Sequence, residues 1–444
     1  MLVQTMLYVF NNKILYSKEK FRLVGQICFY VGIFFLPSSI LLASIPFLIS
    51  AIIGSFLNNK NYFNDIWNKL FFSCGILMIT NILFQNFFIE DLYTEQLDPK
   101  LSFIGLGNWI PYFWLFWSFQ IYLDSSSKRK KISLILISGT LPVLVSGLGQ
   151  YFFSWYGPFT ALNGLIIWFQ RPITINDGLT GLFSSPNYAG SWLIFIWPLC
   201  ISLFLDSTKN YLKKTLSICF LTSVGMTAFL THSRNAWLGL ILSVPIVVGS
   251  ESFIWLGIIF SFIFLIISIC IFPIFEGEFQ NYLRVIIPEK IWMEFSDKGF
   301  EELDIKRIEI ILQAIKISFI RPLIGLGASA FTTIFALKTG FWKGHSHNLI
   351  IELAISYGIP LTILLVLTVL ALLINSGKTL FLNKYNNIYE KAWWTSIFVF
   401  IVSQFMDIQY FEGRISLLSW ILLSGVKKII DEKDEKFLNE KINS

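Results

Sequence analysis

Long apolar runs, separated by short polar stretches, constrain the fold of this chain more than any other feature. Runs of about 20 apolar residues recur along the sequence, and each is long enough to cross a bilayer as a helix. Only 14% of the 444 residues are charged and the mean hydropathy is +0.65, whereas soluble proteins contain about 25% charged residues. We therefore predict an all-α polytopic membrane protein.

The apolar runs predict about 12 transmembrane helices. Pro37 and the Ser38-Ser39 pair predict a break inside the first apolar block, because proline interrupts a helix. The predicted spans lie near residues 23–37, 38–57, 68–88, 108–123, 132–153, 187–205, 214–232, 235–249, 252–273, 347–374, 391–408 and 414–430.

The distribution of basic residues predicts the orientation of these spans. Short cytoplasmic loops of membrane proteins carry an excess of Lys and Arg. With a cytoplasmic N-terminus, the basic run 128–131 and the pair Lys427 and Lys428 fall on the inner side, while Glu90 and Asp91 fall in an acidic outer loop. We therefore expect both termini in the cytoplasm.

Two long loops then face outward, at 154–186 and 274–346. Within the second, residues 305–320 alternate apolar and charged residues at helical spacing, which predicts an amphipathic helix that lies in the interface or caps the bundle. The chain divides into an N-terminal membrane region with about five spans and the first outer loop, a core, the last two spans and a charged tail, at 1–180, 181–375, 376–430 and 431–444.

Several other classes of site and partner find little support. The five cysteines all lie in apolar runs without a CxxC pair, which predicts buried thiols rather than a disulfide framework or a zinc site. The net charge of +6 is spread over short loops, which argues against nucleic-acid binding. No cleavage pattern follows the first apolar run, so we expect it to stay as an anchor.

The titratable groups gather at the outer ends of spans. Two of the three histidines share the sequence His345-Ser346-His347-Asn348, and the third, His232, lies two residues before Arg234. An arginine near the hydrocarbon boundary costs about 2.5–3.5 kcal/mol if it lies deep in the membrane, and such a residue usually has an anionic partner. Its planar guanidinium suits phosphate oxygens. The alternative is that Arg234 extends to lipid headgroups.

His347 is the candidate general base, because an imidazole can accept a proton from a hydroxyl near neutral pH. Asn348 and Glu352 are available to orient its ring. The alternative is a loop histidine that only forms hydrogen bonds at the interface, and His345 is the weaker candidate for the base. We expect no metal, because the HxH pair lacks a nearby third ligand and no HExxH pattern exists.

Two further polar features accompany these residues. Gly325 and Gly327 could turn backbone N–H groups toward an anion, although a tight turn explains them equally well. Asn187 follows Pro186 at the start of a predicted span. It caps that helix or contacts the substrate.

Together these segments resemble the O-antigen ligase and polymerase family of bacterial inner-membrane proteins. The resemblance rests on Ser-Pro-Asn at 185–187, Ser-Arg-Asn-Ala-Trp-Leu at 233–238, Pro-Leu-Ile-Gly-Leu-Gly at 322–327 and His347-Asn348 followed by Gly358. It covers residues 181–375 best. The family often has Gly-x-x-Gly where this chain has Gly358-Ile359-Pro360-Leu361, so the helix packing there is open.

The resemblance implies a GT-C-like glycosyltransferase architecture and an active site outside the cytoplasm. It implies a donor glycan on a polyprenyl pyrophosphate, an acceptor glycan, lipid or protein, and neither a metal nor a cofactor. Arginines such as Arg234, with Arg307 or Arg321, would hold the pyrophosphate, and His347 would activate the acceptor hydroxyl. Further candidates for substrate binding are Arg414, His345, His232 and Asn187.

Two functions therefore compete. The first is glycan transfer in surface polysaccharide assembly, as a ligase or a polymerase. The alternative is a membrane transporter of a small anion such as bicarbonate, which the cationic outer loop would attract. A transporter usually has two similar halves with broken helices at matching positions, and the sequence contains no internal repeat.

Overall fold

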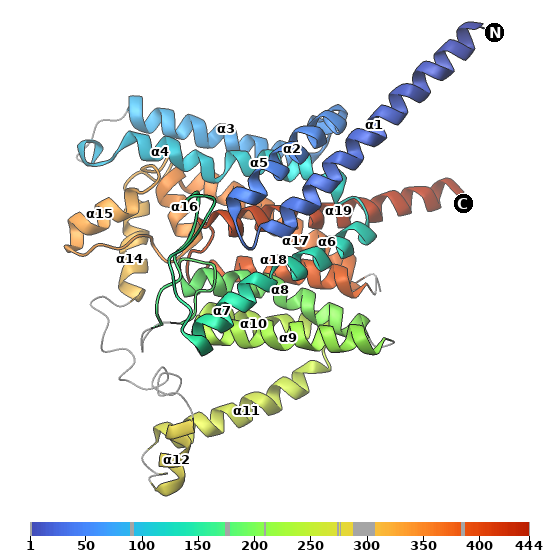
Figure 1. Cartoon of the computed structure of the whole chain (residues 1–444). Helices are drawn as coiled ribbons and strands as arrows, with labels where there is room; N and C mark the ends of the chain where they lie inside the picture. The colour runs from blue at the N-terminus through green and yellow to red at the C-terminus, as the bar shows by residue number, and fades with distance from the viewer. Residues whose placement is uncertain are drawn as a thin grey trace.

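The computed structural model is a bundle of helices that run in roughly the same direction, from left to right in Figure 1. The structure describes residues 2–88, 93–173, 178–207, 210–272, 275, 277–286, 307–382 and 387–443. Helices dominate these residues, so the predicted all-α class is confirmed. The described residues add one small two-stranded sheet that the sequence did not predict.

The elements follow one another with short connections. The first half contains α1 Leu2–Phe35, α2 Ile40–Leu57, η1 Asn59–Asn64, α3 Ile66–Phe87, η2 Thr94–Gln96, α4 Pro99–Gly105, η3 Leu106–Asn108, α5 Ile110–Ser118, η4 Phe119–Tyr122, α6 Ser126–Gly139, α7 Leu141–Phe153, β1 Phe159–Ala161, β2 Ile166–Trp168 and α8 Pro186–Asp206. The second half contains α9 Tyr211–Leu230, α10 Arg234–Val248, α11 Ser252–Ile271, α12 Glu278–Ile286, α14 Arg307–Ser318, α15 Ala330–Thr339, α16 Leu349–Tyr357, α17 Ile359–Gly377, the π-helical turn η7 Lys378–Leu382, α18 Ile388–Ser403 and α19 Gly413–Asn443.

Six helical segments of the described chain are long and apolar enough to cross a membrane. They are Ile40–Leu57, Ile66–Phe87, Ser126–Phe153, Pro186–Asp206, Ser252–Ile271 and Ile359–Leu382. The protein is therefore a polytopic membrane protein, while the count of 12 spans and the GT-C-like architecture stay predictions.

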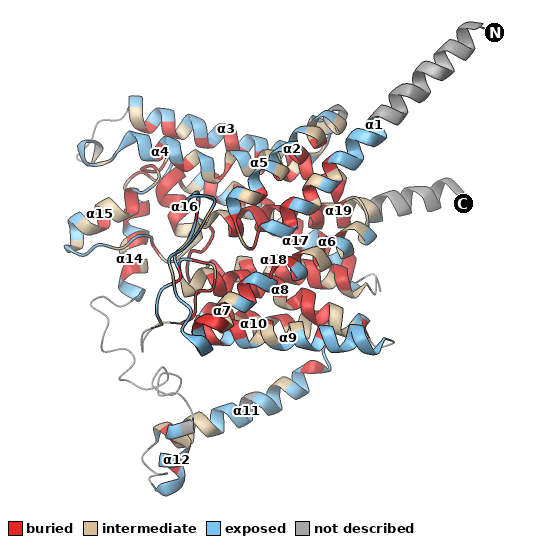
Figure 2. Ribbon diagram, viewed as in Figure 1, coloured by how far each residue is buried: buried red, intermediate tan, exposed pale blue. Residues whose placement is uncertain are grey.

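Helices α8, α18 and α19 form the centre of the bundle (Figure 2). Trp192 on α8 and Trp393 on α18 are fully buried, and the Ser396 hydroxyl donates a hydrogen bond to the Phe195 carbonyl across the α8–α18 contact, at 2.7 Å. Helices α11 and α12 instead lie apart from the bundle in Figure 1, and α11 exposes apolar side chains along most of its length. Lipid contact suits such a helix.

The predicted single span at 347–374 is wrong, because the chain breaks at Gly358 into α16 and α17. Gly358 has φ 88° and ψ 158°, a conformation that glycine alone adopts easily. A Cβ atom there would lie 2.3 Å from the Leu323 carbonyl oxygen. The break is thus required by the close approach of residues 322–327.

Two other span boundaries also differ from prediction. The span predicted at 132–153 begins at Ser126, where the Ser125 hydroxyl caps α6, and it bends between α6 and α7 before Pro142. The span predicted at 108–123 contains only the nine-residue α5, followed by the 3-10 turn η4. By contrast, the break predicted near Pro37 is present between α1 and α2.

The two long loops carry structure of their own. Strands β1 and β2 form an antiparallel hairpin within residues 154–186, and the Trp168 indole donates to the Ser38 carbonyl at 2.6 Å. The predicted amphipathic helix is α14, whose buried residues Ile310, Ala314 and Ile317 pack with α15 and α16. It therefore caps the bundle. Glu90, Asp91 and residues 287–306 lie outside the described residues.

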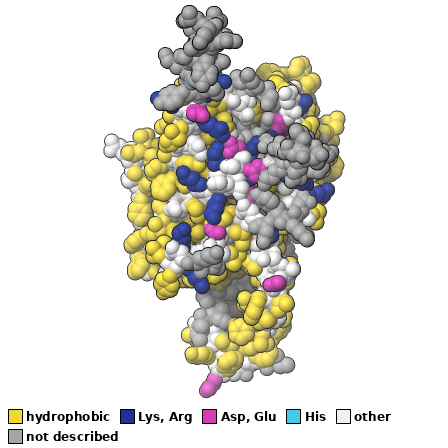
Figure 3. Space-filling model, turned by 90° about the vertical axis from the view of Figure 1, so that its right-hand side faces the viewer, with side chains coloured by type: hydrophobic (Ala, Val, Ile, Leu, Met, Phe, Trp, Pro, Cys, Tyr) yellow, Lys and Arg dark blue, Asp and Glu magenta, His cyan; other side chains and the backbone are white. Residues whose placement is uncertain are grey.

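Both termini leave the bundle on the same side, opposite α14 and α15 (Figure 1). Figure 3 shows this terminal side, where charged side chains gather in the middle and apolar side chains surround them. Ion pairs join helix ends here, including Arg129 with Glu390 at 2.9 Å and Lys130 with Asp206 at 2.8 Å. A charged end within an apolar belt fits a membrane protein seen along its helices.

Candidate active site

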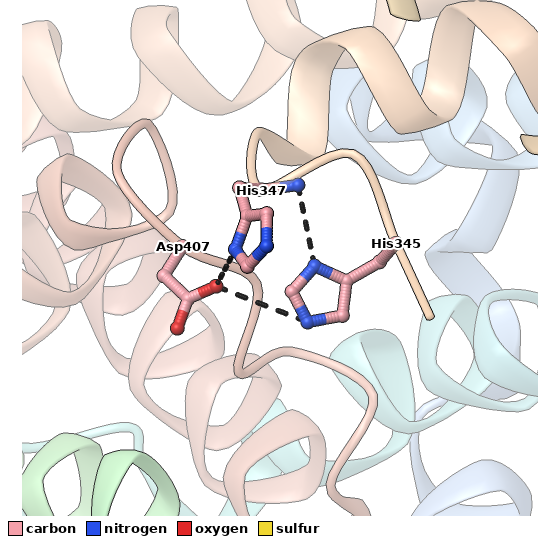
Figure 4. Close-up of side chains that lie close together, drawn as sticks. All are labelled: His345, His347 and Asp407. Carbon is pink, nitrogen blue, oxygen red and sulfur yellow. Dashed lines mark hydrogen bonds and ion pairs between the residues drawn. The ribbon is translucent and has the colours of Figure 1, made fainter. Parts of the chain in front are cut away.

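His347 meets a carboxylate at the end of the bundle opposite the termini. Its Nδ1 atom lies 2.7 Å from Oδ1 of Asp407 (Figure 4). A carboxylate can only accept a hydrogen bond, so Nδ1 carries the proton and the Nε2 atom of His347 is left as an acceptor. This arrangement gives His347 the tautomer that a general base needs.

Backbone and side-chain contacts hold the two loops of this pair together. Asn348 caps α16, because its Oδ1 atom accepts from the N–H groups of Ile350 and Ile351. Its Nδ2 atom donates to the Phe405 carbonyl at 3.1 Å, and the Leu349 N–H donates to the Gln404 carbonyl at 3.0 Å. The start of α16 is therefore bonded directly to the end of α18, and His347 and Asp407 lie on the loops joined there.

The loop before α16 is tightly constrained. His347 has φ 58°, the left-handed conformation that few residues other than glycine adopt. The buried Ser346 N–H donates to Oε2 of Glu352 at 2.9 Å, and the Ser346 hydroxyl donates to the Asn348 carbonyl at 3.0 Å. Glu352 thus holds the backbone of this loop rather than the ring of His347, which corrects the role expected for it.

Asp407 is also held from the other side of the site. Asn187, in the first turn of α8, donates through Nδ2 to Oδ2 of Asp407 at 2.9 Å. The helix is capped by Ser185, which precedes Pro186. Asn187 therefore belongs to the same hydrogen-bonded group as His347, although the two residues come from distant parts of the chain.

The local electrostatics favour an ionised Asp407. Burial alone would raise the pKa of Asp407, but the hydrogen bond from His347 and the positive charges of His345, His347 and Arg307 lower it below its ordinary value. Burial lowers the pKa of His345, while Asp407 opposes that shift and His347 and Arg307 add to it. Arg307 thus acts electrostatically on both residues.

The other predicted arginines occupy different surroundings. Arg307 begins α14 and is exposed, whereas Arg321, after that helix, is buried. Arg414 is buried as well. Its guanidinium donates to Glu412 at 2.7 Å and to the carbonyls of Pro37 and Leu182, each at 3.1 Å. These contacts favour a structural role for Arg414, joining α19 to two outer loops.

Arg234 lies at the same end of the bundle as the pair of His347 and Asp407. It is the exposed first residue of α10. The preceding residue, Ser233, packs on Gly190, where an added Cβ atom would lie 3.0 Å from its side chain. Gly190 is one turn along α8 from Asn187. His232, in the turn before, has φ 54° and is half-buried.

The glycines at 325 and 327 serve the helix break rather than an anion. The N–H groups of Leu326 and Gly327 donate to the carbonyls of Ile355 and Ser356 at 2.7 and 3.0 Å. On the other side, α3 supplies Asn81 to the Tyr357 carbonyl at 2.7 Å and Gln85 to the Ser356 carbonyl at 3.1 Å. The carbonyls that end α16 therefore all have partners, as a break within a membrane requires.

Comparison with known proteins now identifies this arrangement. The family described as O-antigen ligase matches residues 218–366. The chain contains an O-antigen ligase domain. No curated protein matches the chain. The family expected from the motifs is confirmed, and it supports a role in surface polysaccharide assembly in the bacterial inner membrane.

The O-antigen ligase domain runs from α9 into α17 and includes Arg234, Arg307, Arg321, His345 and His347. Asn187, Asp407 and Arg414 lie outside the matched residues. The site is therefore completed by helices on both sides of the domain. The match gives no support to the alternative of anion transport.

A metal could be considered at the same place. One ligand atom each from His345, His347 and Asp407 lies within 4.8 Å of the others. However, two ligands at tetrahedral zinc lie about 3.3 Å apart when each is about 2.05 Å from the metal, and the closest contact here is 2.7 Å. That distance is typical of a hydrogen bond. The geometry therefore favours hydrogen bonding between His347 and Asp407, and metal independence stays a prediction.

Asp407 is the functional residue that sequence reasoning missed. It follows the apolar run of α18 in Gln404-Phe405-Met406-Asp407, a lone carboxylate at the end of a span. The predicted topology put this loop on the same side as His347, and that coincidence was the available signal. Gln404 was missed for the same reason; its Oε1 atom accepts from the N–H groups of Gln409 and Tyr410, both at 3.1 Å.

Proposed function

We propose that this protein transfers a glycan from a polyprenyl pyrophosphate to an acceptor hydroxyl at the outer face of the inner membrane. The observation that carries the proposal is the hydrogen bond of 2.7 Å between His347 Nδ1 and Asp407 Oδ1. It leaves the second ring nitrogen for the acceptor. The O-antigen ligase match supports this class of donor and acceptor.

In the proposed step, Nε2 of His347 takes the proton of the acceptor hydroxyl. The acceptor oxygen attacks the anomeric carbon of the donor sugar, and the bond from that carbon to the pyrophosphate breaks with inversion. The polyprenyl pyrophosphate leaves with the electron pair. Asp407 acts as a positioning residue, since it orients the imidazole and stabilises its charged form.

The cationic groups have a matching role. A leaving pyrophosphate gains negative charge, and guanidinium groups bind phosphate oxygens in a bidentate manner. Arg307 is exposed and its charge reaches Asp407 and His345. Arg234 stands at the start of α10 on the same side. We propose that these two arginines hold the donor, and that Arg321 does not.

The first prediction concerns the base. His347→Ala should lower the rate of glycan transfer by about 10²-fold to 10⁴-fold, the usual contribution of general base catalysis. The measurement is transfer by the full-length protein in nanodiscs, with lipid-linked glycan from a strain that lacks the gene. The rate of the unaltered protein should be equal with and without EDTA.

The control is His232→Ala, at a histidine outside this pair. It should insert normally and keep most of the activity. Full transfer by His347→Ala would refute the proposed function. A rate that EDTA abolishes and Zn²⁺ or Mg²⁺ restores would refute its metal independence.

A further inference from the structure

We propose that a polar pocket beside His345 binds a sugar ring of the acceptor, so that the acceptor is a glycan or glycolipid. This inference rests on the proposed function and assigns the second substrate of that site. The pocket lies between α16, the turn from η3 to α5 and the loop at Gly344 and His345.

The pocket adjoins the proposed base. His345 is one of its walls, and the centroids of the His345 and His347 rings are 4.5 Å apart. Nε2 of His345 lies 3.8 Å from Oδ1 of Asp407, as Figure 4 shows. A ring held in the pocket is therefore separated from the pair of His347 and Asp407 by one imidazole.

The side chains of the pocket suit a neutral sugar. Asn108, Ser329, Glu352 and Ser356 present an amide, two hydroxyls and a carboxylate, which together can both donate to and accept from sugar hydroxyls. Aromatic walls come from Trp109, Tyr357 and Phe411. Pockets that combine apolar and aromatic walls with a few polar groups are typical of small-molecule sites.

The charge of the pocket separates the two substrates. Among its described lining residues, Glu352 is the carboxylate and none is Lys or Arg, so the pocket disfavours a pyrophosphate. The cation Arg307 instead acts on His345 and Asp407. Pyrophosphate is thus attracted to the arginines and repelled by Glu352, while an uncharged ring meets no such penalty.

The size of the pocket agrees with one ring. Its volume is about 150 Å³, and an engineered apolar cavity of about this volume binds benzene. Glu352 is 6% exposed and accepts from the Ser346 N–H, so the same side chain lines the pocket and holds the loop of His347. A bound ring would therefore lie against the residue that positions the base loop.

The test separates the KM values of the two substrates. Asn108→Leu and Ser356→Ala each remove a polar group from the pocket, and each should raise the KM for the acceptor about tenfold. The KM for the donor should stay unchanged. The acceptor is the envelope glycolipid fraction of a strain that lacks the gene, and the donor is its accumulated lipid-linked glycan.

Asn86→Leu is the matched control. Asn86 lies near the same end of α3 but outside the pocket, and its side chain donates to the Ile82 carbonyl of its own helix. Both KM values should be unchanged in this variant. Unchanged acceptor KM in Asn108→Leu and Ser356→Ala would overturn the proposal, as would an equal rise in the donor KM. Acceptor activity that protease destroys and periodate leaves intact would also overturn it.

Binding without turnover distinguishes this proposal from the proposed function. Immobilised His347→Ala protein should retain the acceptor fraction, and the double variant with Asn108→Leu should lose about nine-tenths of that retention, the counterpart of a tenfold weaker affinity. If His347→Ala still transfers glycan, the proposed function fails while this binding result stands or falls by itself.

Discussion

At the scale of single residues, the site depends on how Asp407 treats His347. The carboxylate is nearly buried, at 5% exposure, and receives hydrogen bonds from His347 and Asn187. A buried charge with two donors is stabilised by them, and removing it leaves those donors without their partner. Asp407 therefore contributes both to the fold of the outer loops and to the orientation of the imidazole.

Asp407→Asn should reduce transfer by about 10²-fold, because a misplaced base costs about that much. The acidic limb of the pH–rate profile should move to lower pH, since the imidazole holds its proton less tightly without the carboxylate. A merely structural residue would lower the amount of folded protein and leave the profile in place. An unchanged profile would contradict the positioning role.

The same substitution has a pH-dependent effect on stability. The pKa of Asp407 is lower in the folded protein than its ordinary value of 3.8, so the ionised group stabilises the fold above that pH. This stabilisation is lost as the pH falls through the lowered pKa. Thermal unfolding should therefore separate Asp407→Asn from the unaltered protein at pH 7, and the separation should shrink in acid.

The two candidate arginines should respond differently. Arg307→Ala should raise the KM for the donor about tenfold or more, since one charge-assisted contact is lost. Arg307→Lys should recover only part of this, because an ammonium cannot bind in a bidentate manner. Arg321→Ala should mainly lower thermal stability, as its side chain is buried. The reverse pattern would exchange their roles.

At the scale of elements, the break between α16 and α17 positions the base. Helix α16 starts at the cap that follows His347 and ends at Gly358, where residues 322–327 and α3 supply hydrogen bonds to its last carbonyls. Its two ends are therefore held by different parts of the chain. This short helix is the element that transmits the packing of the bundle to the site.

Gly358→Ala should destabilise the protein by about 2 kcal/mol or more, through its backbone conformation and the close Leu323 carbonyl. Gly257→Ala on α11 is the control, because nothing lies within 4 Å of its added Cβ atom. That variant should be neutral or slightly stabilising. Thermal unfolding in detergent measures both, and equal melting temperatures would contradict the role of the break.

At the scale of the whole molecule, the two ends of the bundle differ in chemistry. The terminal side is tied by ion pairs, and the buried Arg129 joins α6 to Glu390 on α18 and to Glu432 on α19, at 2.9 and 3.0 Å. The opposite side carries the pair of His347 and Asp407 and the polar pocket. The bundle thus places its proposed chemistry at one end only.

Labelling should reveal this sidedness. In a Cys219→Ser background, Trp342→Cys should react with an impermeant maleimide in intact spheroplasts, because residue 342 lies in the loop before His345 and is exposed. Tyr211→Cys, at the start of α9 on the terminal side, should react only after permeabilisation. Both positions are at least 74% exposed, so accessibility within the fold does not limit either reaction. The opposite result would invert the proposed orientation.

Hydropathy, basic residues and short motifs were enough to predict a polytopic helical protein, the amphipathic cap α14 and the family. Each is a local property of the chain, since membrane solvation and helix periodicity act on neighbouring residues. The partner of His347 was not predictable in this way, because Asp407 lies 60 positions away. Nor was the burial of Arg129, within a basic run that sequence alone assigned to the surface. Which side chains meet depends on how the helices pack, and only the tertiary structure decided that.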